Sequence, residues 1–326
     1  MYSNSTTQPI GGYFELELPP PRALPHNGLQ GFQSARAAFL ALLRAGRPNR
    51  VWLPKYICNA MLAPLMRAGM AYAWYDLTEH WQVDPAIQLQ TGDWLVYVNY
   101  FGLCSKPVDD LLQRFPPEQI ILDYSQAFFA PPSPQALATL YSPRKFFGVP
   151  DGGLLHSQIP VPQSTHIDQD AFARMSHLLR RLGDTPEAGY TAYQHAEHSL
   201  DDPEPKRLSP LSARILSSID FDAVRAKRRA NFQYLHSRLG ADQQSFAAMK
   251  DTDIPLCYPY RSDQPGLRQA LIRQRLFIAT YWPEALERLA PHRANSLVNN
   301  LLPLPIDQRY GNEDMERIAT AILAHR

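Results

Sequence analysis

Two stretches decide how this chain is interpreted: ILDYSQA at residues 121–127 and YSPRKFFGVPDGG at residues 141–153. Each opens on the end of a short apolar segment that is typical of a buried strand. Asp123 ends the first of these strands, and Lys145 follows the second. In open α/β sheets, ligands bind at the carboxyl ends of the strands. We therefore expect the two side chains to lie at one ligand site.

Strands and helices alternate along residues 31–160, to both sides of these stretches. Ser34 is a plausible N-cap for the first helix. The alternation predicts an α/β domain with a mostly parallel sheet and helices on both faces. The expected strands are 50–54, 71–76, 93–102, 119–123, 138–142 and 153–156, and the expected helices are 33–44, 58–69 and 108–115.

The rest of the chain predicts three further regions. Residues 1–30 are expected to form an N-terminal arm, with alternation at 13–18 that suggests a short strand. Residues 31–214 then form the large domain and residues 215–326 a smaller α+β domain. Within these, we expect a loop at 184–210, helices at 211–239 and 266–274, strands at 254–258 and 277–281, and a C-terminal helix from Asn312.

Composition excludes several classes of function. The net charge of +1 predicts no nucleic-acid or membrane-surface partner. The three cysteines show no C-x-x-C spacing, and the ten histidines are scattered without H-E-x-x-H, so no disulfide framework or metal site is expected. The N-terminus does not resemble a signal peptide, and no apolar stretch is long enough to cross a membrane. These observations favour a cytoplasmic protein.

The chemistry of pyridoxal 5′-phosphate (PLP) suits the residues found here. PLP enzymes use a lysine amine, a carboxylate beside the pyridine nitrogen, donors for the phosphate and a flat side chain against the ring. Taken singly, these residues have commoner structural explanations: an aspartate caps a turn, a lysine is a solvated charge, and Asp-Gly-Gly is a turn. The order Asp-x-x-Gln, Ser-x-x-Lys and a glycine-rich return is hard to obtain from packing alone.

The same three motifs resemble those of the DegT/DnrJ/StrS family of fold-type I PLP-dependent aminotransferases, often called sugar aminotransferases. The resemblance covers about residues 31–160. It implies that Lys145 holds the cofactor and moves the proton, and that Asp123 is the partner of the pyridine nitrogen. It further implies that Gln126 lies beside the ring, that Ser142, Ser34 and Ala35 bind the phosphate, and that Tyr56 stacks on the ring.

The function that this resemblance implies is transfer of an amino group, with glutamate as donor, to a nucleotide-linked keto-sugar. Such enzymes are homodimers and serve surface polysaccharide or secondary metabolite biosynthesis. The chain departs from the family in its short length, in the tighter spacing between Ser142 and Lys145, and at two motifs. The return reads Asp151-Gly152-Gly153 where Gly-Glu-Gly-Gly is commoner, and Arg207-Leu208-Ser209-Pro210-Leu211-Ser212 replaces a Gly-Tyr-Asn-Tyr-Arg stretch. Ser209 or Ser212 could reach the phosphate site of a partner subunit.

Three other functions remain open on the sequence. A PLP-dependent sugar dehydratase or lyase is disfavoured because related dehydratases replace the lysine with histidine, and Lys145 is present here. A fold-type I scaffold that binds without catalysing would fit the short chain. A Rossmann oxidoreductase is disfavoured because no G-x-G-x-x-G follows the first strand.

The basic residues 225–229 are expected on a solvated helix face, with a substrate phosphate as the alternative partner.

Overall fold

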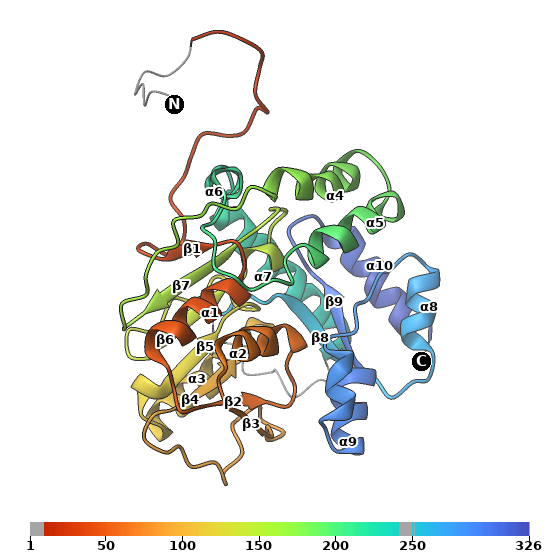
Figure 1. Cartoon of the computed structure of the whole chain (residues 1–326). Helices are drawn as coiled ribbons and strands as arrows, with labels where there is room; N and C mark the ends of the chain where they lie inside the picture. The colour runs from red at the N-terminus through yellow and green to blue at the C-terminus, as the bar shows by residue number, and fades with distance from the viewer. Residues whose placement is uncertain (1–9, 241–249, 251, 326) are drawn as a thin grey trace.

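A seven-stranded sheet forms the centre of the molecule (Figure 1), and the computed structural model describes residues 10–240, 250 and 252–325. The strand order is β1-β7-β6-β5-β4-β2-β3. Only β7 runs against its neighbours, so the prediction of a mostly parallel sheet is confirmed. The strands are β1 (Gln30–Phe32), β2 (Arg50–Pro54), β3 (Tyr72–Tyr75), β4 (Asp93–Val98), β5 (Ile120–Asp123), β6 (Ala138–Tyr141) and β7 (Gly153–Ser157).

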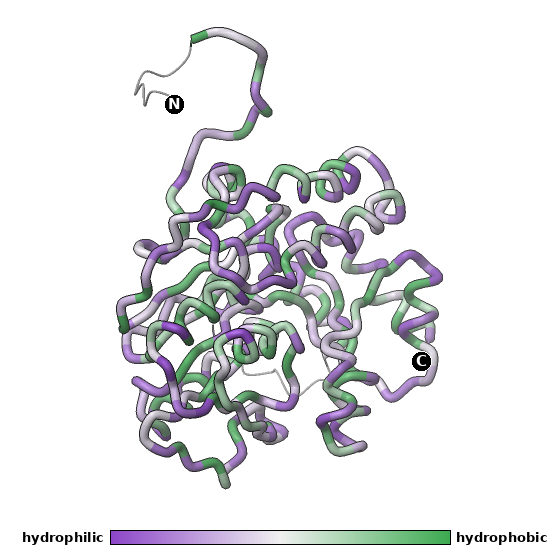
Figure 2. The backbone as a smooth tube through the Cα atoms, in the orientation of Figure 1, coloured by the Kyte–Doolittle hydropathy of each residue, from purple (hydrophilic) through white to green (hydrophobic). Residues whose placement is uncertain are grey.

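Burial explains why the middle strands are almost continuously apolar. Every residue of β4, β5 and β6 is buried, as expected for strands covered on both faces. Figure 2 shows that the surrounding elements alternate between hydrophobic and hydrophilic stretches, as amphipathic helices do. The helices of this half are α1 (Ala35–Gly46), α2 (Leu62–Ala68), α3 (Ser105–Arg114), α4 (Ala171–Gly183), α5 (Pro186–His198) and α6 (Pro210–Ser217).

A two-stranded antiparallel sheet anchors the C-terminal part of the chain. Its strands are β8 (Cys257–Arg261) and β9 (Leu301–Pro305). The helices of this part are α7 (Phe221–Leu239), α8 (Leu267–Arg273), α9 (Pro291–Ala294) and α10 (Asn312–Leu323). Among the residues described, no helix combines the length and the apolar character that crossing a membrane requires.

Several expected elements are different in the structure. The expected loop at 184–210 contains α5, which begins at Pro186 after the Thr185 cap. The expected helix at 211–239 is divided into α6 and α7, because Asp220 caps a new helix by accepting a hydrogen bond from Ala223 N. Residues 13–18 and 277–281 form no strand, since neither segment pairs with another described segment. The strand expected at 254–258 begins at Cys257.

Gly153 lies against the start of α1, and this contact has no room for a side chain. A Cβ at Gly153 would lie 2.1 Å from the Ser34 carbonyl carbon and 2.4 Å from the Ala35 nitrogen. Next to it, the amide of Gly152 donates a hydrogen bond of 2.7 Å to the carbonyl oxygen of Gln33. The first strand-to-helix junction and the glycine-rich return are therefore packed backbone to backbone.

We predict that Gly153→Ala lowers the free energy of unfolding by about 1–3 kcal/mol, because the added methyl group forces the backbone at Ser34 to move. Chemical denaturation of the purified protein measures the change. Gly183→Ala is the matched control, since no atom lies within 4 Å of its added Cβ. Equal stability of the two variants would contradict the packing described here.

Candidate active site

Asp123 and Lys145 lie at the same edge of the central sheet. Strands β5 and β6 are parallel neighbours, with Asp123 opposite Leu140, and both strands end at this edge. Lys145 belongs to a single 3₁₀ turn, Pro143–Lys145, that follows β6 directly. The Asp123 side chain is buried, whereas Lys145 is exposed and its amine has no hydrogen bond or ion pair with the described part of the chain. The structure therefore brings together an acid and an unengaged amine.

Asn99, whose backbone is hydrogen-bonded to that of Asp123, has a buried side-chain donor without a partner among the residues described. Asp123 Oδ1 accepts a hydrogen bond of 2.8 Å from Ser125 N, and the Asp123 carbonyl accepts one of 3.0 Å from Asn99 N. The Asn99 side chain is buried, and its Nδ2 has no hydrogen-bond partner among the residues described. Buried donors of this kind are rare in folded proteins. The sequence prediction did not include Asn99.

Gln126 is committed in part to the fold. Its Oε1 accepts a hydrogen bond of 2.8 Å from the amide of Phe101. Phe101 has a φ of 57°, a left-handed conformation that is unfavourable for a bulky residue. The carboxamide oxygen thus stabilises the 3₁₀ turn Tyr100–Gly102 that follows β4, and the NH₂ group is the part of Gln126 that could meet a ligand.

Tyr56 does not join the other predicted residues at an open surface. Its ring stacks on Tyr100 with a centroid distance of 5.7 Å and meets the edge of Trp282 at 4.6 Å. Its hydroxyl donates a hydrogen bond of 2.9 Å to the carbonyl of Leu297, and only 1% of the residue is exposed. The structure therefore leaves Tyr56 no exposed face on which a cofactor ring could stack.

The turn that carries Lys145 is held from three directions. Arg144 forms an ion pair with Glu197 of α5. The carbonyl of Phe146 accepts a hydrogen bond of 2.8 Å from Gln308 Nε2, and the guanidinium of Arg228 lies 4.6 Å from the centre of the Phe146 ring. These contacts fix both neighbours of Lys145 and leave its own side chain free to move.

Arg228 corrects the expectation that residues 225–229 form a solvated face. Its side chain is buried, with 1% of the residue exposed. It donates hydrogen bonds to the carbonyls of Pro255 and Leu256 and to Gln308 Oε1. Burial lowers the pKa of Arg228 to about 10, so the guanidinium stays charged at neutral pH. A basic run along a helix did not reveal which of its residues faces inward.

Ser34, Ala35 and Ser142 lie around the same edge. Ser34 caps α1 by accepting a hydrogen bond of 3.1 Å from Ala37 N, so the helix begins with backbone donors directed out of its first turn. Ser142 follows β6, is half-buried, and makes no side-chain hydrogen bond within the described chain.

Cys58 links this edge to the loop before α2. Burial raises the pKa of the Cys58 thiol, while a hydrogen bond from Ala60 and the positive charges of Lys145 and Arg36 oppose this effect. Cys58, Lys145 and the first turn of α1 are therefore within electrostatic reach of one another. The sequence prediction treated Cys58 only as one of three scattered cysteines.

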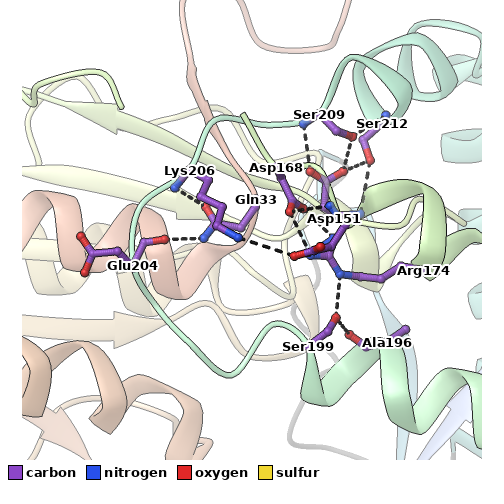
Figure 3. Close-up of polar contacts among 11 residues, drawn as sticks. Gln33, Asp151, Asp168, Arg174, Ala196, Ser199, Glu204, Lys206, Ser209 and Ser212 are labelled. Carbon is purple, nitrogen blue, oxygen red and sulfur yellow. Dashed lines mark hydrogen bonds and ion pairs between the residues drawn. The ribbon is translucent and has the colours of Figure 1, made fainter. Parts of the chain in front are cut away.

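The Asp151 side chain accepts several hydrogen bonds that the sequence did not predict (Figure 3). Its fully buried carboxylate accepts hydrogen bonds from Ser209 N at 2.9 Å, from Ser209 Oγ at 2.7 Å and from Ser212 Oγ. The hydroxyls of Ser209 and Ser212 are thus engaged within their own chain. The expectation that one of them reaches a partner's phosphate site is not supported by this geometry.

The chain just before Ser209 is paired with the residue before Ser34. Gln33 N donates to Lys206 O at 3.1 Å, Lys206 N donates to Gln33 Oε1 at 2.8 Å, and Gln33 Nε2 donates to Glu204 O at 2.6 Å (Figure 3). Residues 204–212 therefore cross both the start of α1 and the glycine-rich return, and hold them together.

A cavity of about 930 Å³ is lined by residues of α4, α5, β9 and α10, and none of its lining residues belongs to the lysine turn, Pro143–Lys145. The segment 307–310 contacts both the cavity and the residue after the turn. Gln308 donates a hydrogen bond to the Phe146 carbonyl, and the next residue, Arg309, lines the cavity. Two of the lining arginines are paired, Arg309 with Asp307 and Arg275 with Glu187. The charged and aromatic lining residues are Arg181, Glu187, Tyr190, Arg275, Phe277, Arg309, Tyr310, Asp314 and Arg317.

Comparison with known proteins gives matches at the level of structure. No family model and no curated protein matches the chain. The sugar aminotransferase CalS13 from Micromonospora echinospora superposes with a TM-score of 0.60 at 14% identity, over 91% of this chain and 87% of that one. A DegT DnrJ EryC1 StrS aminotransferase from Brucella abortus gives 0.59 at 15% identity, over 92% and 86%.

A third structure, Spr1654 from Streptococcus pneumoniae in its PLP form, gives a TM-score of 0.63 at 14% identity, over 91% of this chain and 86% of that one. At these identities the likeness establishes the fold. The chain has the fold-type I architecture of these aminotransferases, so the fold expected from the sequence motifs is confirmed.

We predict that Ser212→Ala lowers the free energy of unfolding by about 1–3 kcal/mol, because the buried carboxylate of Asp151 loses a donor. Chemical denaturation at neutral pH measures the loss. Ser176→Ala is the control, since Ser176 is exposed on α4 and changes there stay within about 0.5 kcal/mol. A Ser212→Ala protein as stable as this control would refute the anchoring role of Asp151.

Proposed function

We propose that this chain is a PLP-dependent aminotransferase that transfers an amino group, with glutamate as donor, to a nucleotide-linked keto-sugar. The observation that carries the proposal is the shared strand edge of Asp123 and Lys145, next to the capped start of α1. A carboxylate, an unengaged amine and a helix N-terminus are the groups that hold the ring nitrogen, the reactive carbon and the phosphate of PLP.

The residues present fit this cofactor. The buried Asp123 carboxylate would keep a pyridine nitrogen protonated. The Nδ2 of Asn99 is a further buried donor without a partner among the residues described. The first turn of α1 and the Ser142 hydroxyl would meet the phosphate. When bound, PLP supplies a ring that absorbs the negative charge developing on the substrate carbon.

Lys145 is suited to move the proton of the reaction. Its amine is exposed and makes no competing ion pair within the described chain, while Arg144 and Phe146 on either side are held in place. The amine can therefore take the proton from the carbon that loses the amino group. In the second half of the transfer it can deliver a proton to the carbon that gains the amino group. This proton transfer requires the lysine. Because related dehydratases have histidine at this position, the presence of Lys145 disfavours the dehydratase alternative.

The cavity supports a negatively charged, ring-bearing substrate. Four arginines and three aromatic residues line it, and guanidinium groups bind phosphates through paired hydrogen bonds. The cavity volume of about 930 Å³ is near the upper end of the range for small-molecule sites. Both features suit a diphosphate-linked sugar with a nucleobase.

The proposal extends to the setting of the enzyme. We propose a cytoplasmic homodimer that feeds surface polysaccharide or secondary metabolite biosynthesis, with the large domain at 31–214 and the small domain at 215–326. The separate sheets support this division, since β1–β7 all lie before residue 158 and β8–β9 lie after residue 256.

The first test of the function is covalent attachment of PLP. We expect borohydride reduction of the PLP-loaded protein to leave a pyridoxyl group on the peptide that contains Lys145, detected by mass spectrometry. Lys145→Ala should lose this label and at least about 100-fold of the amino transfer rate. Lys106→Ala, which removes an exposed lysine of α3, is the control. Labelling of another lysine in the wild-type protein would overturn the assignment.

The second test concerns the arginine-lined cavity. We expect Arg181→Ala and Arg275→Ala each to raise the KM for a nucleotide-linked keto-sugar by about 10- to 100-fold, the range for a lost hydrogen bond to a charged group. Arg180→Ala is the matched control, because this neighbour on α4 does not line the cavity. An unchanged KM in both cavity variants would exclude the cavity as the nucleotide site.

A further inference from the structure

The N-terminal arm presents apolar side chains that no described part of its own chain covers. Residues 10–17 extend away from the body of the molecule (Figure 1), and Tyr13 and Phe14 are 99% and 97% exposed. Hydrophobic positions alternate along this segment with the acidic Glu15 and Glu17 (Figure 2). Within the described chain, residues 10–17 make no hydrogen bond or ion pair.

The arm leaves the body at a fixed point beside α6. Arg214 donates hydrogen bonds to the carbonyls of Leu18 and Pro19, and Arg22 forms an ion pair with Asp220. Arg22 N also donates to the carbonyl of Ser217. The exposed segment is therefore held at its C-terminal end, and its direction is set by α6.

Helix α4 presents a second uncovered apolar surface. Phe172, Met175, Leu179 and Leu182 recur at the i, i+3, i+7 and i+10 spacing that places side chains on one helix face. We call these four residues the α4 stripe. Phe172, Leu179 and Leu182 are 72%, 52% and 86% exposed, whereas most surface helices direct such a face inward.

The inner face of α4 is already committed, so the stripe cannot turn inward. Arg174 is buried and pairs with Asp168 through two hydrogen bonds, one of them 3.1 Å long, and its Nε donates to Ser199 Oγ at 2.8 Å (Figure 3). These contacts tie α4 to the body and to the end of α5. The orientation that exposes the stripe is thus the stable one.

We infer that the arm of one copy of this chain packs on the α4 stripe of a second copy. The two surfaces match in character: in an extended arm Phe14 and Leu16 share one face, which packs on the apolar stripe, while Glu15 and Glu17 lie on the opposite face and stay in solvent. An extended arm of eight residues reaches about 25 Å, and the stripe is about 15 Å long. This inference goes beyond the proposed reaction and does not depend on it.

A two-fold arrangement of two copies makes the exchange reciprocal. The root of the arm and the α4 helix both contact α6, so they lie on one side of the molecule. The arm of the same chain points away from α4 in Figure 1. Turning a second copy about an axis near α6 would bring each arm to the opposite stripe, which is the isologous contact of a dimer.

Disulfide trapping between two singly substituted proteins tests the pairing directly. Tyr13→Cys, Phe14→Cys or Leu16→Cys is mixed with a tagged Leu179→Cys or Leu182→Cys protein under mild oxidation. We expect a crosslinked species of two chains that reductant dissolves. Ile272→Cys, at an exposed apolar position on α8, replaces the α4 cysteine in the control mixture. The absence of any arm-to-stripe crosslink, or an equal yield of crosslink in the Ile272→Cys control mixture, would overturn the inference.

The dimer dissociation constant provides an independent readout. We expect deletion of residues 1–17 and the double change Leu179→Glu with Leu182→Glu each to raise it by at least about tenfold, because each removes a buried apolar cluster. A wild-type protein that sediments as a monomer, or a dimer unaffected by the deletion, would refute the arm exchange.

Discussion

The buried carboxylate of Asp151 is the interaction on which the rest of the site depends. Three hydrogen bonds from Ser209 and Ser212 hold the segment 204–212 over it, and the same segment pairs with Gln33. The segment 204–212 thereby holds the glycine-rich return in contact with the start of α1, where a side chain at position 153 would not fit. It reinforces the pairing of β1 with β7 and the hydrogen bond from Gly152 N to Gln33 O, which join the same two segments.

The sequence predicted the parts of this arrangement that local patterns encode. Short apolar runs located β2 to β7, and Ser34 was recognised as a cap because a serine before an apolar helix satisfies a free backbone donor. Asp123 and Lys145 were expected at one edge because parallel strands end together. These inferences need only residues that are close in sequence, together with one rule of sheet topology.

The remainder depends on contacts between residues far apart in the chain. Asp151 appeared to be an ordinary turn residue, since its serine partners lie 58 and 61 positions later. Tyr56 was expected in a ligand site and Arg228 on a solvated helix face. Rings and carbonyl groups from residues distant in sequence bury both side chains. Helix α5 was missed because its polar composition resembles a loop, and Thr185 and Pro186 were the signals that could have located it.

The reversed direction of β7 constrains how this chain can vary in length. A parallel strand in that position would require a crossover of a dozen or more residues to the opposite edge. Because β7 instead starts where β6 ends, Lys145 and Gly153 stay on one short connection. Surface loops elsewhere in such a fold absorb insertions. One added residue between Ser142 and Gly152 would instead displace the amine from the helix start, so the site constrains the length of this connection.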